Sequence, residues 1–160
     1  MSKKEDKTNA MRILDSKKIE YKYYSYDNTI LNAVEVANCL GQNPAMIFKT
    51  LVTVGKSNEY YVFMVPSEDE LDLKKAAKIA EEKSLEMIPH KELLLITGYV
   101  HGGCSPIGMK KQFKTFIHAT AETLDTICFS VGRIGYQIQL SLKELQKVIE
   151  VTPAAITKSI

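Results

Sequence analysis

The stretch Phe48-Lys49-Thr50-Leu51-Val52-Thr53-Val54 is followed, after Gly55-Lys56-Ser57-Asn58, by Glu59-Tyr60-Tyr61-Val62-Phe63-Met64-Val65. Both long stretches are rich in β-branched and aromatic residues, which favour strands because their side chains pack well on a pleated surface. The short segment between them is polar and contains glycine, as is typical of a tight connection between antiparallel strands. We therefore predict a β-hairpin over residues 48–65.

Helices and further strands are expected on both sides of this hairpin. Thr8, Asp72 and Ser141 each precede a helical pattern and are expected to cap it, and Gly41 is expected to end another helix. Because helices and strands do not alternate strictly, we favour an α+β domain with a curled, mixed β-sheet over a doubly wound parallel sheet. The expected helices span residues 8–18, 32–40, 72–82, 91–96 and 141–149, with one turn after Asn43-Pro44 and a helical tail from Thr152-Pro153; the expected strands span 21–26, 85–87, 114–118, 126–130 and 136–140.

The length and composition fit one domain. The chain has 160 residues, of which 45% are hydrophobic and 25% are charged, and a domain of this size can bury a core without metals or disulfides. We predict a domain over residues 8–158, preceded by a disordered tail over residues 1–7. The N-terminus is charged, and no apolar run reaches the roughly 18 residues needed to span a membrane, so we expect a cytoplasmic protein without a membrane partner.

The cysteines and histidines show no metal-binding or disulfide pattern. Cys39, Cys104 and Cys128 are widely spaced and form no Cys-x-x-Cys pair, which argues against both a disulfide framework and a thiolate zinc site. The histidines lack the i, i+4 spacing of a helical metal site. We therefore expect three reduced thiols, no metal and no cofactor.

Lysines gather in two places although the net charge of the chain is only +2. One cluster lies within residues 74–78 and the other within residues 110–114, on either side of a glycine-rich segment. Clusters so placed could contact phosphates of a nucleic acid. The alternative is that both are solvated faces with no partner.

Two segments carry residue types that can do chemistry. Lys49 lies inside an apolar strand, where it either points outward or serves as a cation that holds a phosphate or an ester carbonyl. Residues 102–108 read Gly-Gly-Cys-Ser-Pro-Ile-Gly, and their consecutive glycines either form a tight turn or aim amide N–H groups at an oxyanion. The spacing differs from that of a phosphate-binding P-loop. The turn over residues 132–135, taken alone, is a plain hairpin connection.

Cys104 is a candidate nucleophile, with His101 or His118 as its base. A reactive thiolate needs a cationic neighbour or a helix N-terminus, and adjacency in the sequence does not supply that geometry. A serine triad built on Ser105 lacks the Gly-x-Ser-x-Gly motif. A cysteine hydrolase therefore remains as an alternative only.

Short motifs follow one another in a fixed order along most of the chain. They are Thr8-Asn9-Ala10, Tyr26, Leu40-Gly41-Gln42-Asn43-Pro44, Phe48-Lys49-Thr50-Leu51, Leu71-Asp72-Leu73-Lys74-Lys75, Thr97-Gly98-Tyr99-Val100, Gly102-Gly103-Cys104-Ser105-Pro106-Ile107-Gly108, Ser130 and Gly132-Arg133-Ile134-Gly135. In this order and spacing they resemble the YbaK/EbsC family of Cys-tRNA(Pro) deacylases. That family is related to the editing domain inserted in some prolyl-tRNA synthetases.

The resemblance implies a barrel-like, curled mixed sheet of the editing-domain type, surrounded by helices, with a pocket for the 3′ CCA end of an aminoacyl-tRNA. Lys49 matches the family's essential lysine, which binds the substrate's backbone or terminal phosphate. Gly102 and Gly103 match positions that present backbone amides to the ester carbonyl. We expect these three residues to be catalytic, and we expect substrate contacts from Tyr26, Thr50, Cys104, Ser105, Ser130, Gly132 and Gln137.

The resemblance also implies a reaction without an enzyme nucleophile. In the family's proposed chemistry the thiol of the esterified cysteine attacks its own ester carbonyl, while the enzyme positions and polarises the ester. Cys104 then contributes its backbone and not its sulfur. The expected activity is trans-editing, the removal of mischarged cysteine from tRNA(Pro) and also from tRNA(Cys). It is an ester hydrolysis or, because the thiol cyclises, a lyase reaction.

Two segments depart from the family pattern and leave the substrate open. Gln137 stands where well-known members carry aspartate, and glutamine can hydrogen-bond but cannot act as a base or hold an ammonium group by charge. Residues 29–33 differ from the family's aromatic-containing loop. The alternatives are a deacylase for alanine- or serine-mischarged tRNA and a non-catalytic module that binds tRNA or a synthetase. A transient complex with prolyl-tRNA synthetase is expected for a deacylase without an anticodon-reading domain.

Overall fold

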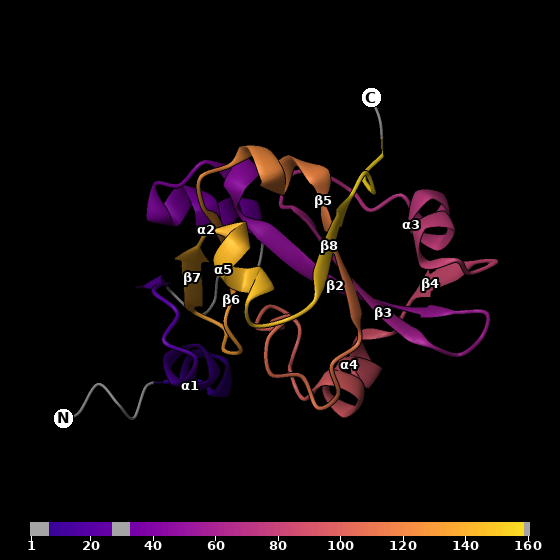
Figure 1. The fold of residues 1–160 in the computed structure, drawn as a ribbon, viewed down its shortest axis with the longest axis horizontal. Coiled ribbons are helices and arrows are strands. Elements are labelled where there is room, and N and C mark those ends of the chain that lie inside the picture. The colour runs from indigo at the N-terminus through magenta and orange to yellow at the C-terminus, as the bar shows by residue number, and fades with distance from the viewer. Residues whose placement is uncertain (1–6, 27–32, 159–160) are drawn as a thin grey trace.

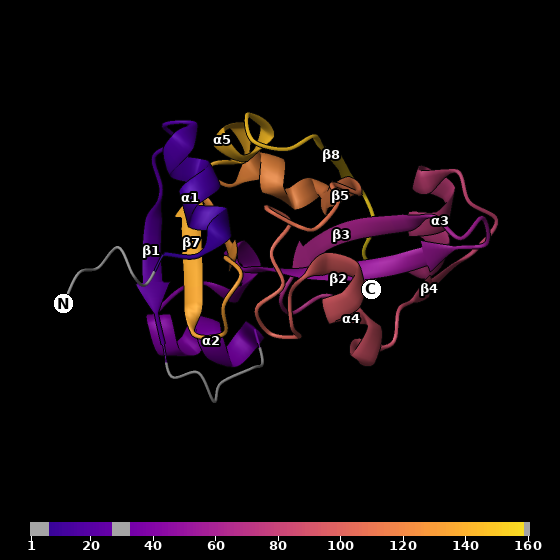
Figure 2. The same ribbon diagram turned by 90° about the horizontal axis from the view of Figure 1, so that it is seen from below.

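The computed structural model describes residues 7–26 and 33–158, whose strands form two sheets. The small sheet lies at one end of the molecule and the large sheet extends away from it (Figures 1 and 2). The large sheet has the order β4 (Leu85–Met87), β2 (Phe48–Gly55), β3 (Tyr60–Pro66), β5 (Lys114–His118) and β8 (Val151–Ala154). The small sheet has the order β1 (Lys22–Ser25), β7 (Tyr136–Leu140) and β6 (Ile127–Ser130).

The hairpin predicted over residues 48–65 forms β2 and β3, which pair antiparallel. β3 then pairs in parallel with β5, and β5 pairs in parallel with β8. The large sheet is therefore mixed, and the predicted α+β class is confirmed. A parallel bridge between Ile47 and Cys128 joins the two sheets just before β2 begins. The strands form an open arrangement and do not close into a barrel.

Three of the helices begin directly after the caps that the sequence predicts. The side chains of Thr8, Asp72 and Ser141 each accept a hydrogen bond from an amide in the turn that follows. Residue 32, the predicted start of one helix, lies outside the described residues. No helix in the described part of the chain has the length and apolar character to cross a membrane. The helices are α1 (Asn9–Ser16), α2 (Ala33–Leu40), α3 (Leu73–Ala80), α4 (His90–Thr97) and α5 (Leu142–Gln146), with 3₁₀ turns η2 (Pro44–Met46) and η3 (Ala119–Thr123).

The helical tail predicted from Thr152-Pro153 is wrong, because both residues belong to β8. The dipeptide resembles a helix start, since proline suits the first turn of a helix. In the structure Thr152 pairs with Phe116 and Pro153 pairs with Ile117. β8 is the edge strand of its sheet, and an edge tolerates a residue without an N–H because its outer side need not donate to a neighbour. Long-range pairing therefore overrides the local signal.

Alternation along β7 separates a buried apolar face from a polar face. Ile138 and Leu140 are buried in the main hydrophobic core, which α1 covers with Leu14. Gln137 and Gln139 lie on the opposite face, because successive side chains of a strand point to opposite sides. β7 thus carries its two glutamines away from the core.

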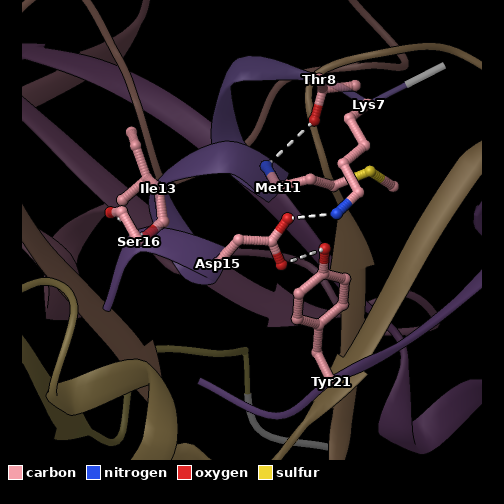
Figure 3. A network of polar contacts seen from close by, with 7 residues as sticks. All are labelled: Lys7, Thr8, Met11, Ile13, Asp15, Ser16 and Tyr21. Atoms are coloured by element: carbon pink, nitrogen blue, oxygen red, sulfur yellow. Dashed lines mark hydrogen bonds and ion pairs between the residues drawn. The ribbon is translucent and has the colours of Figure 1, made fainter. Parts of the chain in front are cut away.

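A small polar network ties α1 to the segment that leads into β1 (Figure 3). Asp15 accepts a hydrogen bond from the Tyr21 hydroxyl at 3.0 Å and forms an ion pair with Lys7. The contact with Lys7 lowers the pKa of Asp15, while burial and the contact with Asp15 raise the pKa of Tyr21 to about 12. Residues 1–6 of the predicted disordered tail lie outside the described residues, whereas Lys7 is held by this network.

Candidate functional site

A cavity of about 280 Å³ opens near the place where the two sheets meet. β2 supplies one wall, β6 and β7 supply a second, and the loop over residues 101–104 supplies a third. The segment that leads from β4 into α4 completes the lining. Gly103, Ser105 and Gly132 do not line it. The expected site residues that do line it are Tyr26, Lys49, Thr50, Gly102, Cys104, Ser130 and Gln137.

Lys49 is the charged side chain of the cavity. It lies on β2 opposite Val65, and the described lining contains no other lysine, no arginine and no carboxylate. Burial lowers the pKa of its ammonium group, while the charges of Glu70 and Asp69 act in the opposite direction to a smaller extent. The ion pairs found between described residues do not include Lys49. A carbonyl or anionic oxygen in the cavity would therefore meet a cation without a competing carboxylate in contact.

The peptide group between Gly102 and Gly103 is held from both sides. Its carbonyl oxygen accepts a hydrogen bond from the Ser130 hydroxyl at 3.3 Å, and its N–H donates to the Val100 carbonyl at 3.0 Å. The amide of Gly103 is thus occupied in this conformation. No hydrogen bond between described residues uses the N–H of Gly102, whose φ of +90° suits glycine. Of the two amides expected to face the ester, that of Gly102 is the available one.

The three expected site residues outside the lining shape the loop that forms the cavity wall. A Cβ at Gly103 would lie 3.0 Å from the Ile134 nitrogen, and a Cβ at Gly132 would lie 2.9 Å from the Tyr99 ring. Ser105 is fully buried, and its hydroxyl oxygen accepts a hydrogen bond from a backbone amide two residues further on. In this structure these residues support the wall and do not reach the cavity.

Two buried oxygen atoms of the cavity have no hydrogen-bond partner among the described residues. They are Oγ1 of Thr50 and Oε1 of Gln137. Gln137 is 4% exposed, and its amide nitrogen donates to the Ser130 hydroxyl at 3.2 Å. Buried polar atoms in folded proteins are almost always hydrogen-bonded. Both oxygens are therefore candidates to be satisfied by a bound ligand.

Cys104 is a thiol in an apolar setting. Its side chain is 6% exposed, and burial raises the pKa of the thiol to about 12. A nucleophilic cysteine needs the opposite shift, which a cationic neighbour or a helix N-terminus provides. His118, one of the two bases considered for it, instead accepts a hydrogen bond from the Ile156 amide and contacts Thr157. The geometry does not favour a cysteine hydrolase.

A histidine that the sequence analysis did not identify joins His101 at the cavity. The rings of His90 and His101 stack with centroids 4.2 Å apart and an interplanar angle of 21°, and both residues line the cavity. Burial lowers the pKa of His101, and the charge of His90 lowers it further. His90 begins α4 and follows a proline, so no local pattern connects it with the glycine-rich loop. Only tertiary packing brings the two rings together.

The lysine clusters lie outside the cavity lining. Lys75 donates to the Thr157 carbonyl at 2.9 Å, and the Lys114 nitrogen lies 5.9 Å from the centroid of the Phe116 ring. The phosphate contacts expected of these clusters stay a prediction. The described residues contain no group of three or more histidine, cysteine or carboxylate side chains that could hold a metal ion.

The chain is similar to known proteins over most of its length. A family model described as "Aminoacyl-tRNA editing domain" matches residues 27–148. A protein of Enterococcus faecalis (strain ATCC 700802 / V583), named "Putative Cys-tRNA(Pro)/Cys-tRNA(Cys) deacylase EbsC", is 46% identical over 141 residues. The matched region covers 87% of this chain and 86% of that relative.

Two solved structures share the fold. A crystal structure of "a putative trans-editing enzyme for prolyl tRNA synthetase" has a TM-score of 0.82 at 21% identity, covering 96% of this chain and 99% of that one. A crystal structure of a hypothetical protein has a TM-score of 0.84 at 17% identity, covering 92% of this chain and 97% of that one. At these identities the likeness concerns the architecture alone.

Proposed function

The chain belongs to the aminoacyl-tRNA editing domain family, and we propose that it is a trans-editing deacylase that removes mischarged cysteine from tRNA(Pro). The observation that carries this proposal is a cavity that combines Lys49, a cation without an ion-pair partner among the described residues, with the available amide of Gly102. Such groups bind and polarise a carbonyl oxygen. The relative from Enterococcus faecalis is named for tRNA(Pro) and tRNA(Cys), so we extend the proposal to both.

The reaction proposed for this cavity uses the substrate's own thiol as the nucleophile. The sulfur attacks the ester carbonyl, a C–S bond forms, and the bond between the carbonyl carbon and the ribose oxygen breaks. The thiol proton ends on the ribose oxygen, so the products are cysteine thiolactone and tRNA with a free hydroxyl. Because both reacting groups belong to one molecule, the protein needs only to hold them in reacting geometry.

Lys49 and Gly102 have complementary roles in this scheme. Attack on the carbonyl places negative charge on its oxygen, to which the Gly102 N–H donates a hydrogen bond. The Lys49 ammonium group stabilises the same charge or holds the terminal phosphate, which keeps the ester in place. Cys104 stays a protonated thiol and takes no part. Alanine esters carry no side-chain nucleophile and serine esters a weaker one, so selectivity for cysteine follows from the chemistry itself.

The test is deacylation of tRNA(Pro) charged in parallel with cysteine, alanine and serine. Wild-type protein is expected to release cysteine rapidly, and Lys49→Ala should be slower by at least about a hundredfold, the effect of losing one oxyanion partner. Lys56→Ala is the matched control, because Lys56 is an exposed lysine in the turn of the same hairpin. It should leave the rate unchanged. Release of alanine or serine instead of cysteine would show that the enzyme has a different amino-acid specificity. Binding of the charged tRNA without turnover of any ester would contradict the proposal that the protein is an enzyme.

Product analysis tests the proposed reaction separately from the activity. Trapping of cysteine thiolactone would support attack by the substrate's thiol, whereas direct formation of free cysteine would indicate attack by water. We further propose a transient complex with prolyl-tRNA synthetase, from which mischarged tRNA(Pro) is released in the cytoplasm. Co-elution of the two proteins in the presence of tRNA(Pro) is the measurement for it.

A further inference from the structure

Two glutamines on the same face of β7 differ in how their amide groups are satisfied. Gln139 uses both ends of its amide, because its oxygen accepts from the Tyr24 hydroxyl and its nitrogen donates to the Thr126 hydroxyl, each at 2.7 Å. Gln137 uses its nitrogen, which donates to the Ser130 hydroxyl, but its buried oxygen has no partner among the described residues. Gln139 therefore serves as a comparison for Gln137, because it lies on the same strand and both ends of its amide are hydrogen-bonded.

The groups around Gln137 fix the orientation of its amide. The Ser130 hydroxyl has one hydrogen, which it donates to the Gly102 carbonyl. Its oxygen must then accept a hydrogen bond, so the NH₂ end of Gln137 faces Ser130. If the amide were turned around, the Ser130 hydroxyl would face two acceptors, the Gly102 carbonyl oxygen and Oε1 of Gln137. It could donate its single hydrogen to only one of them. The hydrogen-bond chain therefore leaves Oε1 of Gln137 as the acceptor for a ligand.

The unsatisfied oxygen is closely connected to the proposed reacting centre. Two consecutive hydrogen bonds link Gln137 through Ser130 to Gly102, and Thr50, whose buried hydroxyl oxygen also lacks a partner in the described structure, lines the same cavity. Oε1 of Gln137 can only accept, whereas the Thr50 hydroxyl can accept or donate, so a single group that donates to both oxygens must bring at least two hydrogens. In an aminoacyl ester the thiol and the ribose hydroxyl bring one each. The α-amino group brings two or three, and it is attached to the carbon next to the ester carbonyl.

We propose that Gln137 and Thr50 form the acceptor pair that binds the α-amino group of the aminoacyl ester. This inference rests on the proposed deacylase function and names the part of the substrate that the pair recognises. Both acceptors are uncharged, and Lys49 is the charged side chain of the described lining. Neither acceptor adds a negative charge to the cavity that contains Lys49. Neutral acceptors bind the amino group and leave Lys49 free for the ester.

The test compares two esters of one RNA, a minihelix with the tRNA(Pro) acceptor stem. One ester carries cysteine, and the other carries 3-mercaptopropionate, which keeps the thiol but lacks the α-amino group. We expect Gln137→Leu to lower kcat/KM by about tenfold to a hundredfold for the cysteine ester and by less than about threefold for the other. The ratio of the two rates cancels their different intrinsic reactivity.

Gln139→Leu is the matched control, because it changes the neighbouring glutamine of the same face, which lies outside the cavity lining. It should leave the ratio of the two rates unchanged. Ser130→Ala removes the link to Gly102 and also releases the amide of Gln137, so it should slow both esters and the cysteine ester more strongly. If Gln137→Leu slows both esters equally, the residue acts only through that link and the proposal is overturned.

A second variant covers the case in which Gln137→Leu does not fold. Thr50→Val removes the other acceptor with little change of shape, and it should show the same loss confined to the cysteine ester. An equal loss on both esters, or no loss on either, would overturn the proposal. Wild-type protein that releases neither ester would refute the deacylase function, and with it the inference that rests on that function.

Discussion

Two hollows in the described part of the chain have opposite character, the cavity at β2 and an open groove beside α1 and β1. The groove is larger, about 980 Å³ against 280 Å³, and Lys7, Asp15 and Tyr21 line it (Figure 3). There Lys7 pairs with Asp15, which also accepts a hydrogen bond from the Tyr21 hydroxyl. In the cavity Lys49 has no ion-pair partner among the described residues, and two buried oxygens lack donors. Polar groups without partners, and not a large volume, therefore distinguish the functional site from the groove.

The largest combined effect on activity and stability is expected from the wall of the cavity, which is built from backbone. In Gly103→Ala the added Cβ would lie 3.0 Å from the Ile134 nitrogen and 3.1 Å from the Arg133 carbonyl carbon. The loop would have to move and would carry the Gly102 amide with it. We expect deacylation to fall at least about tenfold and the free energy of unfolding to fall by about 1–3 kcal/mol. Single-turnover rates and urea denaturation measure the two effects.

The groove provides the control for this change. Lys18 lines the groove and is exposed, so Lys18→Ala should leave both the rate and the stability close to those of wild type. A fully active Gly103→Ala protein, or an inactive Lys18→Ala protein, would contradict the conclusion that the cavity and not the groove is the functional site.

Removing a charge should have opposite effects on stability in the two hollows. Lys49→Met removes a half-buried charge without an ion-pair partner in the described structure, so we expect the free energy of unfolding to rise by about 0.5–1 kcal/mol while activity is lost. Asp15→Asn weakens the contacts with Lys7 and Tyr21, and we expect a fall of up to about 1 kcal/mol with activity intact. Urea denaturation at pH 7 compares them. A loss of stability in Lys49→Met would show that the lysine is satisfied in the folded protein.

Acid should destabilise the cavity before it destabilises the groove. Burial lowers the pKa of His101 and of His118 in the folded protein, so the unfolded chain binds these protons first. Stability is then lost as the pH falls below about 6.5. The pKa of Asp15 is also lowered, but from 3.8, so its contribution is lost only as the pH falls below that value.

The measurement is the free energy of unfolding in urea at pH 7.5 and at pH 5.5. We expect a loss between these two values that is smaller in His101→Gln and unchanged in Asp15→Asn. His118→Gln should reduce the loss as well, because that histidine titrates in the same window. If His101→Gln shows the full loss, the cavity histidine is not a source of the acid sensitivity.

The smallest effect is expected from the thiol of the cavity. Cys104→Ser should keep at least about a third of the wild-type kcat/KM, because a buried thiol with a raised pKa is not the nucleophile. Serine can also keep the contact that the cysteine makes with Thr97. Deacylation of the cysteine ester is the measurement. A folded but inactive Cys104→Ser protein would falsify the substrate-assisted reaction.

Local signals explain which parts of the fold could be predicted from the sequence. The hairpin over residues 48–65 and the caps at Thr8, Asp72 and Ser141 each depend on residues only a few positions apart. The segment 151–154 depends instead on its pairing with β5, and its Thr-Pro dipeptide resembles the start of a helix. A local pattern cannot report a partner strand that lies far away in the chain.

The site residues that could be predicted are those that a single sequence segment identifies. Lys49 was recognisable as a lysine within an apolar strand, and Gly102 as one of two consecutive glycines. His90 was missed because its place beside His101 is set by packing. The free oxygen of Gln137 depends on two other segments that orient its amide. Whether a buried atom is satisfied is a property of the assembled structure, and no pattern in one segment contains it.

The edge strand β8 also matters for how the chain folds while it is being made. β5 pairs on one side with residues 151–154, and the segment that follows reaches back so that Thr157 bridges Leu71. Contacts between residues so far apart in the sequence form slowly, because long loops must close first. During synthesis, residues up to 150 emerge before the strand that covers β5, and an open sheet edge is a place where strands of other chains can pair. Until β8 pairs with β5, that edge of β5 therefore stays open to pairing with a strand of another chain.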